Sequence, residues 1–188
     1  MSQQELLENV INVLDAIGVE YMVTGSLASS LQGEPRATHD IDLVVALTQP
    51  QVPALVRAFS TPTFYLDEAA VREAIKQPGM FNLLDTREGD KVDFWILTDE
   101  DFDRSRFARR YSETIQQRRF VFSQPEDTIL MKLKWARDSG GSEKQYGDAL
   151  RVYEIQAERL DLDYVETWVR RLGVESLWRR LLSEAETV

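Results

Sequence analysis

Stretches of alternating apolar and polar residues divide the first two-thirds of the chain into helices and strands in mixed order. Residues 5–17 carry apolar side chains at the spacing of an amphipathic helix, and Gly18 ends this pattern. Residues 21–24 form a short apolar run that is typical of a buried strand. The same reasoning predicts, in chain order, a strand over 40–45, a helix over 48–59, a strand over 63–66, a helix over 68–76, a hairpin of 80–84 with 92–97, a helix over 99–110 and a strand over 118–123.

The pattern changes at residues 124–127, after which every predicted element is a helix. These helices cover 126–137, 143–159, 164–172 and 175–184, and the glycine-containing segment 139–142 joins the first two. We therefore predict an α+β fold with two domains. A mixed-sheet core occupies residues 1–123, and a C-terminal helical bundle occupies residues 124–188.

The composition excludes several kinds of chemistry. The 188 residues include 43% hydrophobic and 29% charged residues, as in a soluble globular protein. There is no cysteine, which excludes disulfides and thiolate catalysis, and the single histidine, His39, argues against histidine-rich metal sites. The net charge of −10 argues against a surface that coats nucleic acid, although it leaves room for a local basic groove. With neither a signal peptide nor a membrane-spanning run, we expect a cytoplasmic protein that does not contact membranes.

The candidate chemistry is concentrated in residues 21–45. Gly25 follows the first predicted strand, where a residue without Cβ allows a sharp turn. Ser26 then opens a short helix of small residues, whose N-terminus directs free N–H groups at any nearby anion. This combination predicts a phosphate-binding turn.

Two carboxylates open the next predicted strand. Asp40 and Asp42 are two residues apart and leave the same face of the strand, with their Cα atoms about 6.6 Å apart. Asp93 lies within another strand, on the face opposite Val92 and Phe94, where a carboxylate is costly unless it is paired or binds metal. An Asp-x-Asp pair at a strand start is alternatively a simple turn and cap. Three carboxylates on adjacent strands form the oxygen-rich shell that Mg²⁺ prefers, and so favour phosphoryl or nucleotidyl transfer.

These residues carry a family resemblance. Gly25-Ser26, then Asp40-Ile-Asp42 after thirteen further residues, with Asp93 on a later strand, resemble the signature of the polymerase-β-like nucleotidyltransferase superfamily. Residues 36–42 look like those of the minimal nucleotidyltransferases and of the AbiEii and MenT-like toxin group. Residues 125–133 are similar to the segment by which those proteins enter their helical domain.

The resemblance implies an enzyme, a Mg²⁺-dependent nucleotidyltransferase that moves NMP from an NTP to an acceptor hydroxyl. Asp40, Asp42 and Asp93 would bind two Mg²⁺ ions, and Asp93 would also accept the hydroxyl proton. The residues implied to bind the nucleotide are Gly25, Ser26, Arg36, Lys132, Lys144 and Asp148.

The acceptor is left open by the resemblance. It implies tRNA, a protein hydroxyl or a small molecule such as an aminoglycoside, with a toxin–antitoxin or phage-defence role and a cognate toxin or antitoxin partner. One alternative is an antitoxin-like enzyme that adenylylates a partner protein. Another is a non-catalytic module that keeps the fold and binds a nucleotide or a partner.

Three further features have more than one interpretation. Lys132 lies in a helix that is apolar almost all round, so its ammonium group either reaches solvent or faces an internal cleft. Lys144 and Asp148 are four residues apart, the spacing of a surface ion pair. The arginines within 104–119 form either a solvated face or a landing surface for a phosphate-bearing acceptor. Trp135, Trp168 and Trp178 are predicted to be core residues.

Overall fold

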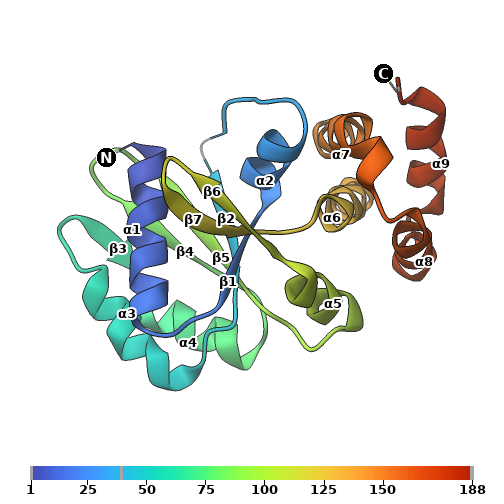
Figure 1. Cartoon of the computed structure of the whole chain (residues 1–188). Helices are drawn as coiled ribbons and strands as arrows, with labels where there is room; N and C mark the ends of the chain where they lie inside the picture. Colours follow the sequence, from blue (N-terminus) through green and yellow to red (C-terminus); the bar gives the residue numbers. More distant parts are fainter. Residues whose placement is uncertain (1, 39, 187–188) are drawn as a thin grey trace.

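One mixed β-sheet organises the computed structural model, which describes residues 2–38 and 40–186. Within these residues, seven strands lie side by side in the order β3-β4-β5-β2-β1-β7-β6 (Figure 1). The strands are β1 (Tyr21–Thr24), β2 (Asp40–Val45), β3 (Phe64–Leu66), β4 (Met80–Asp85), β5 (Lys91–Ile96), β6 (Tyr111–Ile115) and β7 (Arg118–Phe122). Two pairs are parallel, β2 with β5 and β1 with β7, and the other neighbouring strands are antiparallel.

Helices lie on both sides of this sheet. Figure 1 shows α1, α3 and α4 on one side and α2 and α5 on the other, with α6 to α9 gathered beyond α2 and α5. The helices are α1 (Gln3–Ala16), α2 (Gly25–Gln32), α3 (Val52–Ala58), α4 (Glu68–Lys76), α5 (Asp101–Arg109), α6 (Pro125–Asp138), α7 (Glu143–Gln156), α8 (Leu162–Leu172) and α9 (Glu175–Glu184). Within the described residues, no helix combines the length and the apolar character needed to span a bilayer.

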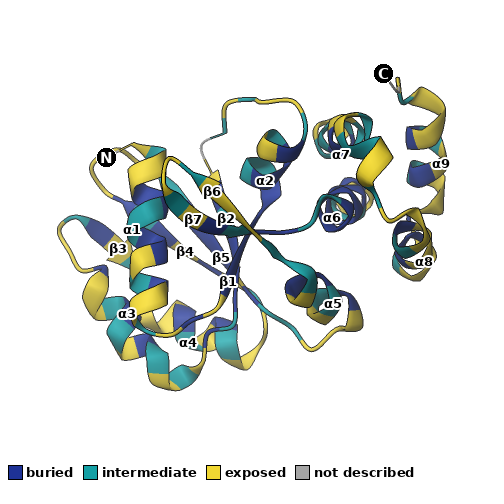
Figure 2. Cartoon of the chain, viewed as in Figure 1, coloured by how far each residue is buried: buried dark blue, intermediate teal, exposed yellow. Residues whose placement is uncertain are grey.

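Two large apolar clusters hold these layers together. The first fills the space between the sheet and α1, α3 and α4, with members such as Val10, Ile41 and Leu55. The second lies among α6 to α9 and includes Leu133 and Val152. Figure 2 shows that burial follows the strands and the inward faces of these helices. Each fully buried aliphatic side chain contributes about 1.5–3 kcal/mol to folding, so both clusters are major sources of stability.

The observed arrangement confirms the predicted α+β class, with a mixed sheet followed by helices. The division into domains 1–123 and 124–188 stays a prediction, since α2 of the first part packs against both α6 and α7 of the second.

Local sequence signals place several of these elements. Ser2 and Glu5 form a reciprocal capping box that starts α1, and the Asp67 carboxylate accepts a 2.8 Å hydrogen bond from the Ala69 amide to start α4. One strand was missing from the sequence-based prediction. β6 turns into β7 through Gln116 and Gln117, which both have positive φ angles of 48° and 68°. Glycine or asparagine normally marks such a turn, so the sequence carries no signal for this hairpin.

Candidate functional site

The site is built on the paired strands β2 and β5. In their parallel register Asp42 lies opposite Asp93, and Asp40 lies opposite Lys91. Alternation along each strand sends Ile41 to the core and directs the aspartates to the other face of the sheet. The strand pairing therefore brings two of the predicted carboxylates side by side, although they are far apart in the sequence.

Burial makes this carboxylate pair costly without a cation. Asp93 is only 8% exposed, and its Oδ1 atom has no hydrogen-bond partner among the described residues. Burial raises the pKa of Asp42, and the nearby Asp93 charge raises it further, although the Trp95 indole N–H donates a 3.3 Å hydrogen bond to Asp42 Oδ1. An orphaned buried oxygen beside a second carboxylate is the arrangement that a divalent cation stabilises. The Asp42–Asp93 pair therefore fits a metal ion.

Lys91 supplies a positive charge at the same place. Its Nζ atom lies 2.8 Å from Asp93 Oδ2 and 3.8 Å from Asp40 Oδ1. The hydrogen bond to Asp93 raises the pKa of Lys91. The Asp40 side chain lies at the rim and is 59% exposed. In the part of the chain that the structure describes, no group of three or more histidine, cysteine or acidic side chains is arranged to hold a metal. A site for two ions stays a prediction.

Gly25 brings the first turn of α2 against this carboxylate pair. Its φ angle is +65°, which L-residues rarely adopt. A Cβ atom at this position would overlap the Asp42 carboxylate, 2.6 Å from its Cγ atom. A glycine is therefore required for the turn and for the close approach.

Arg36 joins the turn to the C-terminal helices. Its Nη2 atom donates a 2.9 Å hydrogen bond to Ser26 Oγ. Its Nε and Nη2 atoms also form a bidentate contact with Asp148 on α7, at 2.9 and 2.8 Å. This contact with Asp148 raises the pKa of Arg36, so the guanidinium remains charged beside Ser26.

Lys132 reaches the same carboxylate from α6. Its side chain is 1% exposed, and its Nζ lies 2.7 Å from Asp148 Oδ2, 2.9 Å from Gln145 Oε1 and 3.5 Å from Ser26 Oγ. Burial lowers the pKa of Lys132, and the Asp148 charge opposes this effect. Burial alone would raise the pKa of Asp148, but hydrogen bonds from Arg36 and Lys132 lower it. Of the two interpretations of Lys132, the structure favours the internal cleft.

The predicted ion pair between Lys144 and Asp148 is wrong. Asp148 points toward α6 and Arg36, and within residues 2–38 and 40–186 Lys144 forms no ion pair. Lys144 instead borders two cavities. One of about 460 Å³ also contacts Ser26, Asp42 and Lys132, and another of about 470 Å³ contacts Arg36 and Asp148. His39 lies outside the described residues.

Two tryptophans at the site were not predicted from the sequence. Trp95 and Trp135 both line the 460 Å³ cleft, with ring centroids 6.4 Å apart. Trp135 is half-buried and packs against the second apolar cluster, so its prediction as a core residue is confirmed only in part, whereas Trp168 and Trp178 are buried as predicted. Spacing carried a signal for both missed residues. Trp95 follows Asp93 by two residues on one strand face, and Trp135 follows Lys132 by three on a helix.

Most arginines within residues 104–119 form ion pairs or hydrogen bonds with other residues of the chain. Arg106 pairs with Asp103, and Arg109 pairs with Glu126 and Asp127. Arg110 pairs with Glu20, and Arg119 donates to Ser112 Oγ at 2.8 Å. These pairings leave much less positive surface than the sequence suggests.

Comparisons with known proteins bear on this site. The family model described as aminoglycoside-2''-adenylyltransferase matches residues 6–89. A comparison with curated proteins gives no match. Among solved structures, the crystal structure of ANT(2'')-Ia in complex with adenylyl-2''-tobramycin has a TM-score of 0.60 at 14% identity, covering 94% of this chain and 99% of that chain.

Two further structures share the fold. The lincomycin-bound lincosamide antibiotic adenylyltransferase LnuA has a TM-score of 0.50 at 12% identity, covering 82% of this chain and 98% of that chain. An antigenic nucleotidyltransferase-like protein from Paracoccidioides brasiliensis has a TM-score of 0.50 at 15% identity, covering 99% of this chain and 96% of that chain. At these identities the likeness shows the fold, and this chain has the nucleotidyltransferase fold.

The matched segment 6–89 contains Gly25, Ser26, Asp40 and Asp42, and ends before Asp93. The family-model match and the structural neighbours together support a nucleotidyltransferase. The family model of the aminoglycoside adenylyltransferases matches less than half of the chain, and a particular closeness to the AbiEii and MenT-like group stays a prediction.

Proposed function

We propose that the protein is a Mg²⁺-dependent nucleotidyltransferase that moves NMP from an NTP to a hydroxyl group of a small molecule. The observation that carries this proposal is the Asp42–Asp93 pair on β2 and β5, against which the glycine turn of α2 packs. A carboxylate pair beside a phosphate-binding turn is what transfer of a nucleotidyl group requires.

The side chains of Ser26, Arg36 and Lys132 form the proposed binding site for the NTP. Ser26 receives hydrogen bonds from Arg36 and Lys132, so all three groups converge on one point. Asp148 pairs with both Arg36 and Lys132, so its single negative charge balances only one of these two cations. A triphosphate supplies negative charge at the same point, and the amides of Gly25 and Ser26 at the start of α2 add to its binding. Lys144 lies at the edge of both cavities, where it attracts the phosphates.

The metal would be held by Asp42 and Asp93, with Asp40 contributing from the rim. When bound, Mg²⁺ would neutralise the phosphate oxygens and make the α-phosphorus more electrophilic. Two ions are the number that the family resemblance implies.

The reaction then needs one displacement. The acceptor oxygen forms a bond to the α-phosphorus, the bond from that phosphorus to the bridging oxygen breaks, and pyrophosphate leaves. Asp93 accepts the hydroxyl proton. Arg36 and Lys132 stabilise the charge that develops on pyrophosphate.

A small molecule is the acceptor that the observations favour. The matching family model and the solved structures of ANT(2'')-Ia and LnuA concern proteins whose descriptions name small antibiotics. The ion pairs of Arg106 and Arg109 on α5, and of Arg110 directly after it, weaken the case for tRNA. Transfer to tRNA or protein, and a toxin–antitoxin or phage-defence role with a cognate partner, are the alternatives that the sequence resemblance supplies.

Label transfer tests the proposal. The purified protein is incubated with each of the four α-³²P-labelled NTPs, with and without Mg²⁺, and with tobramycin, lincomycin, total tRNA or lysate protein. We expect label on a small molecule, only with Mg²⁺, and none with Asp42→Asn. Asp163→Asn changes an exposed carboxylate on α8 and serves as the matched control. Label on tRNA or protein would contradict the small-molecule acceptor. No label on any acceptor would contradict the proposed function.

A further inference from the structure

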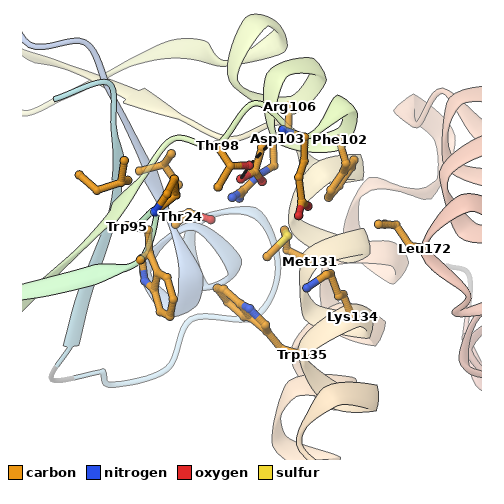
Figure 3. Close-up of a pocket in the computed structure, with 15 residues that line it drawn as sticks. Thr24, Trp95, Thr98, Phe102, Asp103, Arg106, Met131, Lys134, Trp135 and Leu172 are labelled. Atoms are coloured by element: carbon orange, nitrogen blue, oxygen red, sulfur yellow. Dashed lines mark hydrogen bonds and ion pairs between the residues drawn. The ribbon is translucent and has the colours of Figure 1, made fainter. Parts of the chain in front are cut away.

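A cavity of about 410 Å³ lies where the first part of the chain meets the C-terminal helices. Its lining comes from the end of α2, from β6, from the start of α6 and from the turn that follows α7 (Ala157–Arg159). It shares no lining residue with the carboxylate cleft, or with the cavity that Trp95, Met131 and Trp135 border (Figure 3). It is therefore separate from the site that the proposed function uses.

Three glutamines that line this cavity are held in the same way. Each donates a hydrogen bond from its Nε2 atom to a backbone carbonyl: Gln32 to Ser123 at 2.6 Å, Gln124 to Arg109 at 3.0 Å and Gln156 to Gln32 at 2.8 Å. A carbonyl oxygen only accepts, so it fixes which end of each amide faces it. The three Oε1 atoms therefore remain as acceptors, and no residue within 2–38 and 40–186 donates a hydrogen bond to them.

These oxygens favour a ligand that is rich in N–H groups. Gln32 is 3% exposed, and a buried acceptor without a donor is unfavourable. Glu113 on β6 adds an exposed carboxylate that forms no ion pair in the part of the chain that the structure describes. The other lining carboxylate, Glu126, already pairs with Arg109 at 3.2 Å. An ammonium group has three N–H donors and a positive charge, so it matches the three amide oxygens and Glu113.

Arg159 gives the same cavity a free positive charge. Its side chain is exposed, and among the described residues it forms no ion pair. Tyr111 also lines the cavity, and its hydroxyl accepts a 3.5 Å hydrogen bond from Gln32 Nε2, which leaves its own hydrogen free to donate. A guanidinium and a hydroxyl donor together suit a carboxylate. A metal ion or a polyamine would leave Arg159 unbalanced, whereas a ligand that carries both charges balances Arg159 and Glu113.

The remaining surface of the cavity is apolar. Leu31, Pro125 and Leu160 belong to the lining, and Leu31 is 43% exposed. Covering an exposed leucine with an apolar group removes both surfaces from water, which is favourable. The cavity therefore accommodates three parts of one molecule, namely an ammonium group, a carboxylate and a short apolar chain.

We propose that this cavity binds a free α-amino acid with a short apolar side chain. Its ammonium group donates to the glutamine oxygens and pairs with Glu113. Its carboxylate accepts hydrogen bonds from Arg159 and Tyr111. Its side chain packs on Leu31 and Leu160. Because both parts of the chain line the cavity, the bound amino acid stabilises their contact and hence the folded protein.

Three probes with related carbon skeletons test which groups are recognised. Leucine carries both charges, 3-methylbutylamine lacks the carboxylate, and 4-methylpentanoate lacks the ammonium group. Saturation-transfer NMR titrations at neutral pH measure the dissociation constants, with valine and methionine as further amino acids. We expect leucine to bind, and each analogue to bind about fivefold more weakly, because each loses one charged contact. No binding of any of the three amino acids, or an analogue that binds as tightly as leucine, would overturn the proposal.

Two exposed charges allow each end of the ligand to be located without disturbing the core. Arg159→Gln should weaken leucine binding about fivefold and should reduce the preference for leucine over 3-methylbutylamine by the same factor. Glu113→Gln should weaken leucine binding to a similar extent, but should reduce the preference over 4-methylpentanoate instead. Unchanged leucine binding in either variant would overturn the proposal.

Matched controls change exposed charges outside the cavity. Glu158→Gln lies one residue before Arg159, and Arg179→Gln lies on α9. Both should bind leucine as the wild type does, and thermal unfolding verifies that every variant is folded. Leucine should raise the unfolding temperature of the wild type and the controls more than that of Arg159→Gln or Glu113→Gln. The proposal is independent of the proposed function, so a failure of label transfer would leave this binding site standing.

Discussion

The Lys91 ammonium group lies 2.8 Å from the Asp93 carboxylate, at the position where a bound cation would neutralise it. It is also 3.8 Å from Asp40, so one lysine spans two of the three predicted metal ligands. The lysine therefore lowers the electrostatic cost of folding without metal. It would also compete with the proposed metal for the same two carboxylates.

Lys91→Met should separate these two effects. Without metal, the loss of the partly buried ion pair should lower the free energy of unfolding by about 1 kcal/mol. With Mg²⁺ or Mn²⁺, the variant should gain more stability than the wild type does, because the competing cation is gone. Thermal unfolding in EDTA and across a metal titration measures both effects. Lys76→Met, which changes an exposed lysine on α4, is the control, and equal metal stabilisation in all three proteins would contradict the competition.

Gly25→Ala should lower the free energy of unfolding by much more than the positive φ angle alone explains. An alanine at positive φ costs about 1–2 kcal/mol, and overlap with the Asp42 carboxylate should add about 1–3 kcal/mol. Gly18→Ala is a close control, because its φ of +68° nearly equals the +65° of Gly25 and its Cβ would meet no atom within 4 Å. Urea unfolding compares the two variants. Similar losses at both positions would show that the close approach to Asp42 is unimportant.

Asp148→Asn should lower the free energy of unfolding more than Lys132→Met does. Asp148→Asn leaves two cations without a counter-charge, and we expect a loss of about 3 kcal/mol in unfolding free energy. Lys132→Met leaves Asp148 paired with Arg36 and should cost about 1 kcal/mol. Pyrophosphate should stabilise Asp148→Asn more than the wild type, because Arg36 and Lys132 are then free to bind it. Urea unfolding with and without pyrophosphate measures both the two losses in stability and the effect of pyrophosphate. A larger loss for Lys132→Met than for Asp148→Asn would contradict the role of Asp148 as the shared counter-charge.

A buried acid on α6 predicts a pH dependence of stability. Burial raises the pKa of Asp127 to about 6, although Tyr164 donates a hydrogen bond to it and Arg109 lies near. Glu126 raises this pKa further, and Arg106 lowers it. The folded protein therefore holds this proton over a pH range in which the unfolded chain, with a pKa near 3.8, has lost it. The contribution of Asp127 to the free energy of unfolding should therefore fall by on the order of 2–3 kcal/mol as pH rises from about 4 to about 6.

The difference between wild type and Asp127→Asn isolates this effect. Asparagine retains an oxygen that accepts from Tyr164 but does not titrate, so the difference in unfolding free energy should change over this pH range and be level above it. Asp138→Asn is the control, since hydrogen bonds from Arg137 lower the pKa of the exposed Asp138, and its difference from the wild type should therefore stay level between pH 4 and 7 and change only at lower pH. A difference that does not vary between pH 4 and 7 would contradict the raised pKa of Asp127.

Elements with strong local signals were predicted closely from the sequence. β1, β2, α4 and α9 occupy the predicted residues, because short apolar runs, helical spacing and capping residues are local properties. The Gln116–Gln117 turn lacks such a signal, which is why β6 was missed. The sequence also could not show that Asp42 and Asp93 are direct neighbours, since the order of strands depends on packing of the whole sheet.

The same limit applies to the polar contacts. Asp148 lies four residues after Lys144, and only the packing of α7 on α2 and α6 turns it toward Arg36 and Lys132. Arg106 is one of several arginines in the sequence, and its buried environment distinguishes it from Arg104.

The convergence on Asp148 has a consequence for engineering this protein. A fragment that ends at residue 123 would retain the three aspartates and the α2 turn, but Arg36 would lose its bidentate partner. Gln32, at the end of α2, would also lose the 2.8 Å hydrogen bond that its carbonyl accepts from Gln156. A chimera that exchanges the C-terminal helices must therefore carry over Lys132 and Asp148 to keep the contacts that they make with Ser26 and Arg36.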